Sequence, residues 1–135
     1  MGGPISLLYL DCDNFKAVND QWGHSAGDSL LCFVGGVLKV QVRETDTPAR
    51  IGGDEFVVVL PGADEPAVRE VANRVKAALE APARYGEKGV SASMGAVTFL
   101  STPTSAEAMI KAGDTLMYEA KAAGKGVIKF AVLSD

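Results

Sequence analysis

Acidic side chains stand where two apolar stretches of the sequence meet polar residues. Asp11 ends the first apolar stretch, and Asp13 follows two residues later. Asp54 and Glu55 come directly after a Gly-Gly pair and before another apolar stretch. Converging carboxylates repel one another and resist ionisation unless a cation lies among them. Oxygen ligands favour a hard ion such as Mg²⁺, and a pair of such ions would stabilise an in-line displacement at phosphorus.

The alternative interpretation is that these acids are ordinary turn residues, because Asp and Glu are common beside glycine. A second acidic strand end nearby favours a shared site over coincidence. Lysines have the same two interpretations, since Lys16, Lys121 and Lys125 could meet phosphates but a lysine is usually solvated. Composition and spacing by themselves name no reaction.

Histidine and cysteine give little sign of nucleophilic chemistry. His24 is the only histidine, and no Ser or Cys nucleophile pattern surrounds it, so a structural role is favoured. Cys12 points to the opposite face of its strand from Asp11 and is predicted to be buried. The two cysteines cannot form a disulfide framework, so reduced thiols in a cytosolic setting are expected.

The apolar pattern predicts strands that alternate with helices. Strands are expected over Ile5–Leu10, Thr47–Ile51, Phe56–Leu60, Val90–Phe99 and Val127–Val132. Helices are expected over residues 25–43, around Val68–Leu79 and over Ala106–Ala122, with Pro82 stopping the second and Gly124 ending the third. Gly35-Gly36 interrupts the first helix, which close packing on a sheet would explain. Gly52-Gly53 is typical of a tight hairpin.

The order of these elements predicts an α+β fold in a single domain over residues 1–135. The pattern β-α-β-β-α-β is ferredoxin-like, with an antiparallel sheet and helices on one face, and a further C-terminal αβ unit follows. In such a sheet the first strand lies beside the hairpin, so the two acidic strand ends are expected to converge. The 135 residues, 47% of them hydrophobic, suffice for one core and leave no length for a second.

Charge and hydropathy exclude some classes of partner. The net charge of −4 argues against a broad nucleic-acid surface, though not against a nucleotide held through divalent ions. No apolar run reaches the roughly 18 residues of a membrane span, and no basic segment marks a secretory signal. The start Met1-Gly2-Gly3 fits a loose N-myristoylation pattern but is equally a cloning scar, and myristoylation is disfavoured. A cytoplasmic domain is therefore expected.

Four motifs follow one another along the chain. Arg50–Phe56 contains Gly-Gly-Asp-Glu-Phe, and Asp11–Asp28 fits the pattern DxDxFKxxND-x2-GH-x2-GD. Asp114–Lys121 reads Asp-Thr-Leu-Met-Tyr-Glu-Ala-Lys, and Ser93-x-Gly95 fits a turn beside a strand. Together these motifs resemble the GGDEF family of diguanylate cyclases, whose domain is a nucleotidyl-cyclase palm-type fold. The likeness runs from residue 7 to about residue 128.

The resemblance implies a metal centre that joins the two acidic strand ends. Asp11, Asp54 and Glu55, with the carbonyl of Cys12, would ligate Mg²⁺, with two ions per active site and Mn²⁺ as a possible substitute. Asp54 would also help to deprotonate the attacking 3′-hydroxyl. The implied catalytic set is Asp54, Glu55 and Lys16.

The resemblance also implies a guanine nucleotide site. The backbone at Asn14 and Phe15 and the side chain of Lys16 would hold the β- and γ-phosphates. Asn19 and Asp28 would recognise guanine. A carboxylate can accept from both the N1 and N2 donors of guanine, and adenine offers no such pair of donors. The implied substrate-binding set is Asn14, Phe15, Lys16, Asn19, Asp28, Gly53, Lys121 and Lys125.

Each domain of the family holds one GTP, so a homodimer is implied. The 3′-hydroxyl of one GTP attacks the α-phosphorus of the other, pyrophosphate leaves, and a second round closes the ring of cyclic di-GMP. Such domains normally follow a sensor or receiver domain, so this chain is expected to be a fragment, and its parent could be attached to a membrane through another domain.

Arg43-Glu-Thr-Asp46 lies at the position of the family's RxxD inhibitory site. Arg43 offers a bidentate fork to phosphate or guanine, which suits product feedback by cyclic di-GMP, and Arg74 is a weaker partner. The alternative is a helix-end arginine that caps carbonyls beside an aspartate in a turn.

The chain departs from the family pattern at three places. A segment resembling DxLTGLxNR that usually precedes the first strand is absent, and Lys125 stands where arginine is common, which weakens triphosphate binding. Gly113 replaces a usual alanine, with no consequence expected. A second hypothesis is therefore a catalytically silent module that binds GTP or cyclic di-GMP, and a third is a purely structural dimerisation domain.

Overall fold

The fold was analysed in a computed structural model, which describes residues 3–81 and 89–134. Its elements are β1 (Ile5–Cys12), α1 (Phe15–Trp22), α2 (His24–Gln41), β2 (Thr47–Gly52), β3 (Glu55–Pro61), α3 (Glu65–Glu80), β4 (Ala92–Phe99), α4 (Ala106–Ala122) and β5 (Ile128–Leu133). Pro82, expected to stop the second long helix, lies outside the described residues. None of the helices in the described ranges combines the length and apolar character that a membrane crossing needs.

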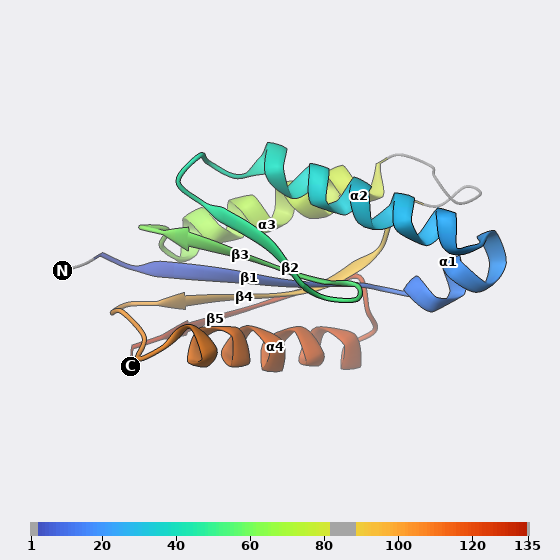
Figure 1. Ribbon diagram of the computed structural model, residues 1–135. Coiled ribbons are helices and arrows are strands. Elements are labelled where there is room, and N and C mark those ends of the chain that lie inside the picture. The colour runs from blue at the N-terminus through green and yellow to red at the C-terminus, as the bar shows by residue number, and fades with distance from the viewer. Residues whose placement is uncertain (1–2, 82–88, 135) are drawn as a thin grey trace.

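A single sheet with the strand order β2-β3-β1-β4-β5 forms the middle of the molecule (Figure 1). Neighbouring strands are antiparallel except for β4 and β5, which run parallel because α4 connects them as a crossover. The predicted ferredoxin-like arrangement with an added C-terminal αβ unit is confirmed. Because β1 lies between β3 and β4, the end of β1 is adjacent to both the hairpin and the start of β4.

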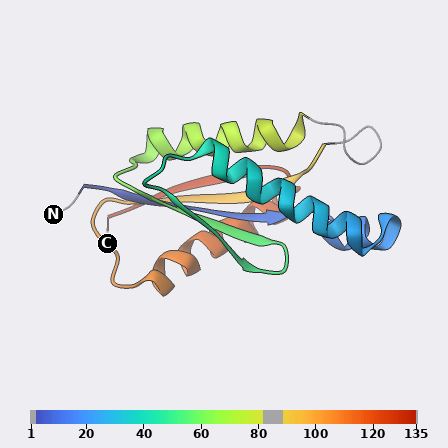
Figure 2. The same ribbon diagram turned by 45° about the horizontal axis from the view of Figure 1, so that its top comes forward.

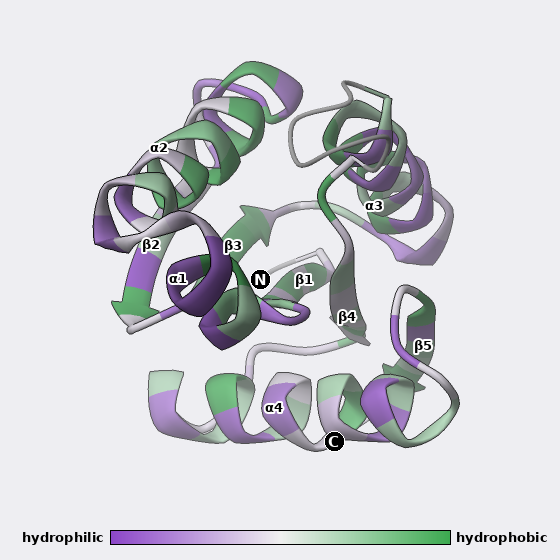
Figure 3. Ribbon diagram, turned by 90° about the vertical axis from the view of Figure 1, so that its right-hand side faces the viewer, coloured by the Kyte–Doolittle hydropathy of each residue, from purple (hydrophilic) through white to green (hydrophobic). Residues whose placement is uncertain are grey.

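The two faces of the sheet are covered by different helices, as Figures 1 and 3 show. Residues of α2 and α3 share one apolar cluster with Leu8 and Leu10 of β1, and residues of α4 share another with Leu7 and Tyr9. Side chains alternate along a strand, so Asp11 falls on the α4 face and Cys12 on the other. Cys12 is 1% exposed, as its predicted burial requires.

The short helix α1 was not expected from the sequence. The sequence predicts one helix that begins at about residue 25, whereas the structure has two helices that meet at Gly23, whose φ is 94°. None of the residues of α1 is fully buried, and only Phe15 and Val18 pack against the core. Phe15, Val18 and Trp22 stand at helical spacing, but a helix of 8 residues is shorter than the roughly 11 residues over which such a pattern indicates a helix. Figures 1 and 2 show α1 at the end of β1.

The glycine pair in α2 does not serve close packing on the sheet, so that explanation is wrong. A Cβ built at Gly35 would first meet the Phe56 ring at 3.9 Å, and one at Gly36 would meet nothing within 4 Å. Helix α2 continues through both positions.

Replacing Gly36 with Ala is therefore expected to stabilise the protein by about 1 kcal/mol, because alanine loses less conformational entropy in a helix. Gly36 is exposed, so the added methyl group displaces nothing. Urea denaturation followed by circular dichroism measures the shift. An unchanged or lower midpoint would contradict the expectation.

Two other glycines set how closely α4 approaches the sheet. A Cβ at Gly95, within β4, would lie 2.6 Å from the nitrogen of Met117 and 2.7 Å from the oxygen of Gly113. A Cβ at Gly113 would lie 2.5 Å from Cδ2 of Leu7. The expected turn at Ser93-x-Gly95 is thus wrong, because these residues lie inside β4. Glycine at position 113, expected to have no consequence, lies against Leu7 and Tyr9 of β1.

Candidate functional site

Strand pairing brings acidic residues together where β1 ends and β3 begins. Asp11 is the register partner of Glu55, and the backbone N–H of Cys12 donates to the carbonyl of Asp54 at 3.1 Å. Directly opposed residues of an antiparallel pair present their side chains on the same face. The side chains of Asp11 and Glu55 therefore both lie on the α4 side of the sheet, next to the tip of the β2–β3 hairpin.

Asp11 carries the clearest electrostatic sign of a cation site. Its Oδ1 is buried and has no hydrogen-bond partner among the described residues. Burial, followed by the neighbouring carboxylate of Asp54, raises the pKa of Asp11 to about 7, although Lys121 opposes the shift with its Nζ 3.5 Å from Oδ1. A divalent cation would reverse this balance and supply the missing partner of Oδ1.

The carboxylates do not form a complete metal site by themselves. The described residues contain no group of three or more His, Cys, Asp or Glu side chains arranged to hold a metal ion. Mg²⁺ commonly uses one or two carboxylates and takes its other ligands from water and substrate phosphates. The orphaned oxygen of Asp11 and the adjacent Glu55 fit that mode of binding.

Glu55 also has a partner that the sequence analysis did not identify. The hydroxyl of Tyr9 donates a hydrogen bond of 2.8 Å to Oε1 of Glu55. Burial, then this hydrogen bond, raises the pKa of Tyr9 above its ordinary value, so the hydroxyl remains a donor at neutral pH. Tyr9 could have been found from the sequence, because strand alternation places it on the same face as Asp11.

An open pocket of about 650 Å³ lies on this face of the sheet. Asp11 and Glu55 line it from the sheet, and residues of α4 between Asp114 and Lys121 line it from the helix. The pocket gives a ligand access to the orphaned carboxylate from the α4 side.

Asp13 does not belong to the cation site, although it stands two residues after Asp11. Its Oδ1 accepts from Ser93 Oγ at 2.7 Å, and its Oδ2 accepts from Ser91 Oγ at 2.6 Å and from the backbone N–H of Gly126 at 2.9 Å. Its side chain is fully buried. Asp13 therefore joins the end of β1 to the start of β4 and to the loop that follows α4.

The loop that follows β1 meets the loop that follows α4. Nζ of Lys125 donates to Oδ1 of Asn14 at 3.3 Å, and both residues have positive φ angles of 62° and 60°. Lys121 lies beside Asp11 instead, while Lys16 is largely exposed and pairs with Asp20 at 3.1 Å. The structure thus brings Asn14 and Lys125 together and places Lys16 apart from them.

The two predicted guanine-reading residues come from α1 and α2. Oδ1 of Asn19 is buried without a hydrogen-bond partner among the described residues. A Cβ at Gly27 would lie 1.8 Å from that atom, so only glycine leaves room for the Asn19 side chain. Asp28 follows Gly27 and is exposed. His24 begins α2 and is exposed as well.

Gly53 occupies the tip of the expected hairpin, which the structure confirms. Nε of Arg50 donates to the carbonyls of Gly52 and Gly53 at 3.2 and 3.0 Å. Neither glycine has a φ in the left-handed region, and a Cβ at Gly53 would meet nothing within 4 Å. The fold of this chain does not itself require glycine at position 53.

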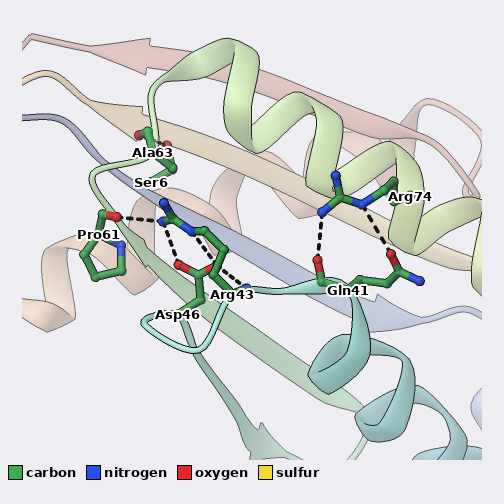
Figure 4. A network of polar contacts seen from close by, with 7 residues as sticks. All are labelled: Ser6, Gln41, Arg43, Asp46, Pro61, Ala63 and Arg74. Atoms are coloured by element: carbon green, nitrogen blue, oxygen red, sulfur yellow. Dashed lines mark hydrogen bonds and ion pairs between the residues drawn. The ribbon is translucent and has the colours of Figure 1, made fainter.

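The predicted inhibitory residues lie on the opposite face from the pocket, around the loop from α2 to β2 (Figure 4). Arg43 donates from Nη2 to Oδ1 of Asp46 and to the carbonyl of Pro61, each at 2.8 Å. Arg74 donates from Nη2 to the carbonyl of Gln41 at 2.8 Å. Arg74 thus caps a carbonyl at the end of α2, whereas Arg43 pairs with the buried Asp46 and with a carbonyl at the end of β3.

Comparison with known proteins identifies the relatives of this arrangement. The family described as "Diguanylate cyclase, GGDEF domain" matches residues 2–126. The chain belongs to the GGDEF family. DgcS, a diguanylate cyclase of Shewanella oneidensis, is 39% identical over 127 residues, which cover 94% of the chain and 42% of DgcS. DgcP, a diguanylate cyclase of Pseudomonas aeruginosa, is 37% identical over 96% of the chain and 20% of its own length.

Solved structures share the fold of this GGDEF domain. The GGDEF domain of YfiN, also called TpbB, from Pseudomonas aeruginosa has a TM-score of 0.87 at 33% identity and covers 98% of the chain and 84% of its own. The GGDEF domain of DgcB from Caulobacter crescentus, solved in complex with cyclic di-GMP, has a TM-score of 0.85 at 25% identity and covers 94% and 77%. The chain spans less than half of the two curated relatives, so it corresponds to one part of such proteins.

Proposed function

We propose that this GGDEF domain condenses two molecules of GTP into cyclic di-GMP and pyrophosphate, with Mg²⁺ or Mn²⁺ as cofactor and a second copy of the domain as partner. The observation that carries the proposal is the buried Oδ1 of Asp11, which accepts no hydrogen bond from the described residues and lies beside Glu55 and 3.5 Å from Nζ of Lys121. Burial and Asp54 raise the pKa of Asp11 to about 7, so a cation beside this carboxylate would stabilise its ionised form. Family membership supplies the identity of the substrate.

The residues of this chain would divide the chemistry between them. Asp11, Asp54, Glu55 and the carbonyl of Cys12 would hold up to two ions, which supply positive charge to the phosphates when bound. Asp54 accepts the proton of the 3′-hydroxyl as that oxygen bonds to the α-phosphorus of the other GTP. The bond from this phosphorus to the pyrophosphate oxygen breaks at the same centre.

Binding residues would lie on both sides of this centre. Lys16, Lys121 and Lys125 offset the charge of the triphosphate, and the backbone at Asn14 and Phe15 offers N–H donors at the start of α1. Oδ1 of Asn19, which accepts no hydrogen bond within residues 3–81 and 89–134, and the exposed carboxylate of Asp28 would accept from the donors on guanine. These two acceptors favour GTP over ATP.

A turnover assay tests the proposal. The protein is incubated with GTP and Mg²⁺, alone and fused to a dimeric coiled coil, and cyclic di-GMP and pyrophosphate are measured by chromatography. Product from the dimeric form, and none after Asp54→Ala, is expected. A folded, dimeric protein that forms no product would reject the enzymatic proposal.

Gly53→Ala is expected to leave folding unchanged and to raise the KM for GTP by roughly tenfold. The reason is that a methyl group at the hairpin tip would obstruct the bound nucleotide without disturbing the fold. The fold has open space at this position. Thermal denaturation and steady-state kinetics measure the two effects. The exposed Gly36→Ala serves as the control. A KM equal to that of the parent would remove Gly53 from the substrate site.

A regulatory role is a second candidate because DgcB, a relative of the same fold, was solved with cyclic di-GMP. The hydrogen bonds of Arg43 to described residues use Nε and Nη2 and leave Nη1 for a ligand. Cyclic di-GMP would bind at Arg43, Asp46 and Arg74 and act as a feedback inhibitor. Calorimetric binding of cyclic di-GMP that is lost in Arg43→Ala would support this site, and a variant that binds as tightly as the parent would exclude it. Binding without turnover would favour a receptor, attached to a sensor or receiver domain in the parent protein.

A further inference from the structure

Tyr9 brings a hydroxyl group to the metal-site carboxylates although its ring is buried. The residue is 3% exposed and lies on β1, two positions before Asp11 and on the same face. Its register partner on β3 is Val57, so Glu55 is its diagonal neighbour. Aromatic side chains reach such diagonal neighbours, and the hydroxyl donates to Oε1 of Glu55 at 2.8 Å.

Two glycines form a slot for the Tyr9 ring. Gly95 is the register partner of Tyr9 on β4 and presents no side chain beside the ring. Gly113 lies above it on α4, where a Cβ would be 3.1 Å from Cβ of Tyr9 and 3.4 Å from Cδ2. Leu7 and Met117 belong to the same apolar cluster. Because packing surrounds the ring, the position of the hydroxyl is set by the core of the protein.

The neighbourhood of Glu55 explains why such a partner matters. Glu55 stands directly opposite Asp11 and next to Asp54, and like charges would turn its carboxylate away into the open pocket. A hydroxyl holds one oxygen without adding a positive charge that would compete with a cation. Among the described residues Oε2 of Glu55 has no hydrogen-bond donor, so it remains available to a ligand.

We propose that Tyr9 is a positioning residue for the metal site: its hydroxyl, held in the slot between Gly95 and Gly113, fixes Oε1 of Glu55 and leaves Oε2 directed to a divalent cation. This inference rests on the proposed function, because it assigns the same carboxylates to a metal. Partners of metal ligands orient them, and removing such a partner typically weakens metal affinity by tenfold or more.

The test is Tyr9→Phe, which removes the hydroxyl and keeps the ring. Mn²⁺ binding is measured by calorimetry in the presence of 3′-deoxy-GTP, a nucleotide that lacks the attacking hydroxyl. The Mg²⁺ concentration for half-maximal turnover is measured separately with GTP. The Kd for Mn²⁺ and the Mg²⁺ concentration for half-maximal turnover are both expected to rise by roughly tenfold in the variant. The KM for GTP is expected to be unchanged at saturating metal.

A matched control separates positioning from general loss of stability. Thr98→Val removes another buried hydroxyl, which bonds to Ser6 at 2.9 Å, at the far end of β1 from the pocket. It is expected to lower folding stability by a similar amount and to leave metal affinity unchanged. In a Glu55→Gln background, Tyr9→Phe is expected to cause no further loss of metal affinity, because the residue acts through Glu55.

The outcomes distinguish this inference from the proposed function. Unchanged Mn²⁺ affinity in Tyr9→Phe overturns the role of Tyr9, even if the parent makes cyclic di-GMP. A parent that makes no product refutes the proposed function, and the calorimetric comparison then decides the role of Tyr9 alone. A parent that binds no Mn²⁺ beside the nucleotide overturns both.

Discussion

Asp11→Asn is expected to abolish the formation of cyclic di-GMP and, at the same time, to make the metal-free protein more stable at pH 8. The loss of activity follows because the ionised carboxylate is needed to bind the cation. Turnover should fall by roughly a thousandfold or more, the order expected when several kcal/mol of charge stabilisation are lost. Chromatographic detection of product measures this part.

The gain in stability follows from the direction of the pKa shift. The pKa of Asp11 is raised from 3.8 to about 7 by burial and by Asp54, so the folded protein binds more protons than the unfolded chain between these values. Stability therefore falls as pH rises through that window and stays low above it. Asparagine cannot ionise, so the variant lacks this fall and should gain on the order of 2 kcal/mol at pH 8, allowing for the lost attraction of Lys121.

Denaturation at pH 5 and pH 8 separates the two proteins. The parent should be less stable at pH 8 than at pH 5, and Mg²⁺ with 3′-deoxy-GTP should raise the stability of the parent at pH 8 more than that of the variant. Glu107→Gln, which removes one exposed charge at the start of α4, is the matched control and should keep the parent's response. The same pH response in Asp11→Asn as in the parent would show that another group carries it.

The sequence was sufficient where the fold depends on local pattern. The alternating side-chain direction along β1, which is buried on both faces, places Asp11 and Cys12 on opposite faces, and the antiparallel pairing of β1 with β3 then determines that Asp11 meets Glu55. Each of these steps depends on periodicity and on the order of the elements, which are visible in a single sequence. The hairpin at Gly53 followed in the same way.

The sequence was insufficient where a residue's role depends on distant partners. Asp13 was considered with Asp11 as one acidic pair, but its three donors stand 78 to 113 residues away, at Ser91, Ser93 and Gly126. Gly113 was expected to have no consequence because nothing near it in the chain shows that Leu7 and Tyr9 lie underneath. Such contacts are properties of the assembled sheet and helix.

The distant contacts of Asp13 lead to the second large expected effect. Asp13→Ala should lower the free energy of unfolding by about 3–5 kcal/mol, because it removes hydrogen bonds to a buried charged group and leaves their donors unpaired. Asp13→Asn should cost less, because the amide oxygen can still accept from some of the donors. Its NH₂ group cannot accept from the backbone N–H of Gly126 if the oxygen faces Ser93. Urea denaturation measures both variants.

A single lost donor provides the scale for this comparison. Ser93→Ala removes one hydroxyl and should cost about 1–2 kcal/mol, clearly less than Asp13→Ala. If the two variants were equally destabilised, the carboxylate would not be the centre of the contacts. Both variants should still bind Mn²⁺ when folded, because Asp13 contacts the cation site only through Lys121, whose Nζ lies 3.7 Å from Oδ1 of Asp13.

The same contacts connect stability to substrate binding. The N–H of Gly126 follows Lys125, whose positive φ and contact with Asn14 depend on how this loop is held. When Asp13 no longer accepts from Gly126, the loop is free to move, and the KM for GTP should rise by roughly tenfold with little change in the metal requirement. A metal-site acid such as Asp11 would show the opposite pattern, with a loss of metal affinity and no loss of folding stability. Steady-state kinetics of Asp13→Asn at several Mg²⁺ concentrations would therefore distinguish a residue that holds the nucleotide loop from one that binds the ion.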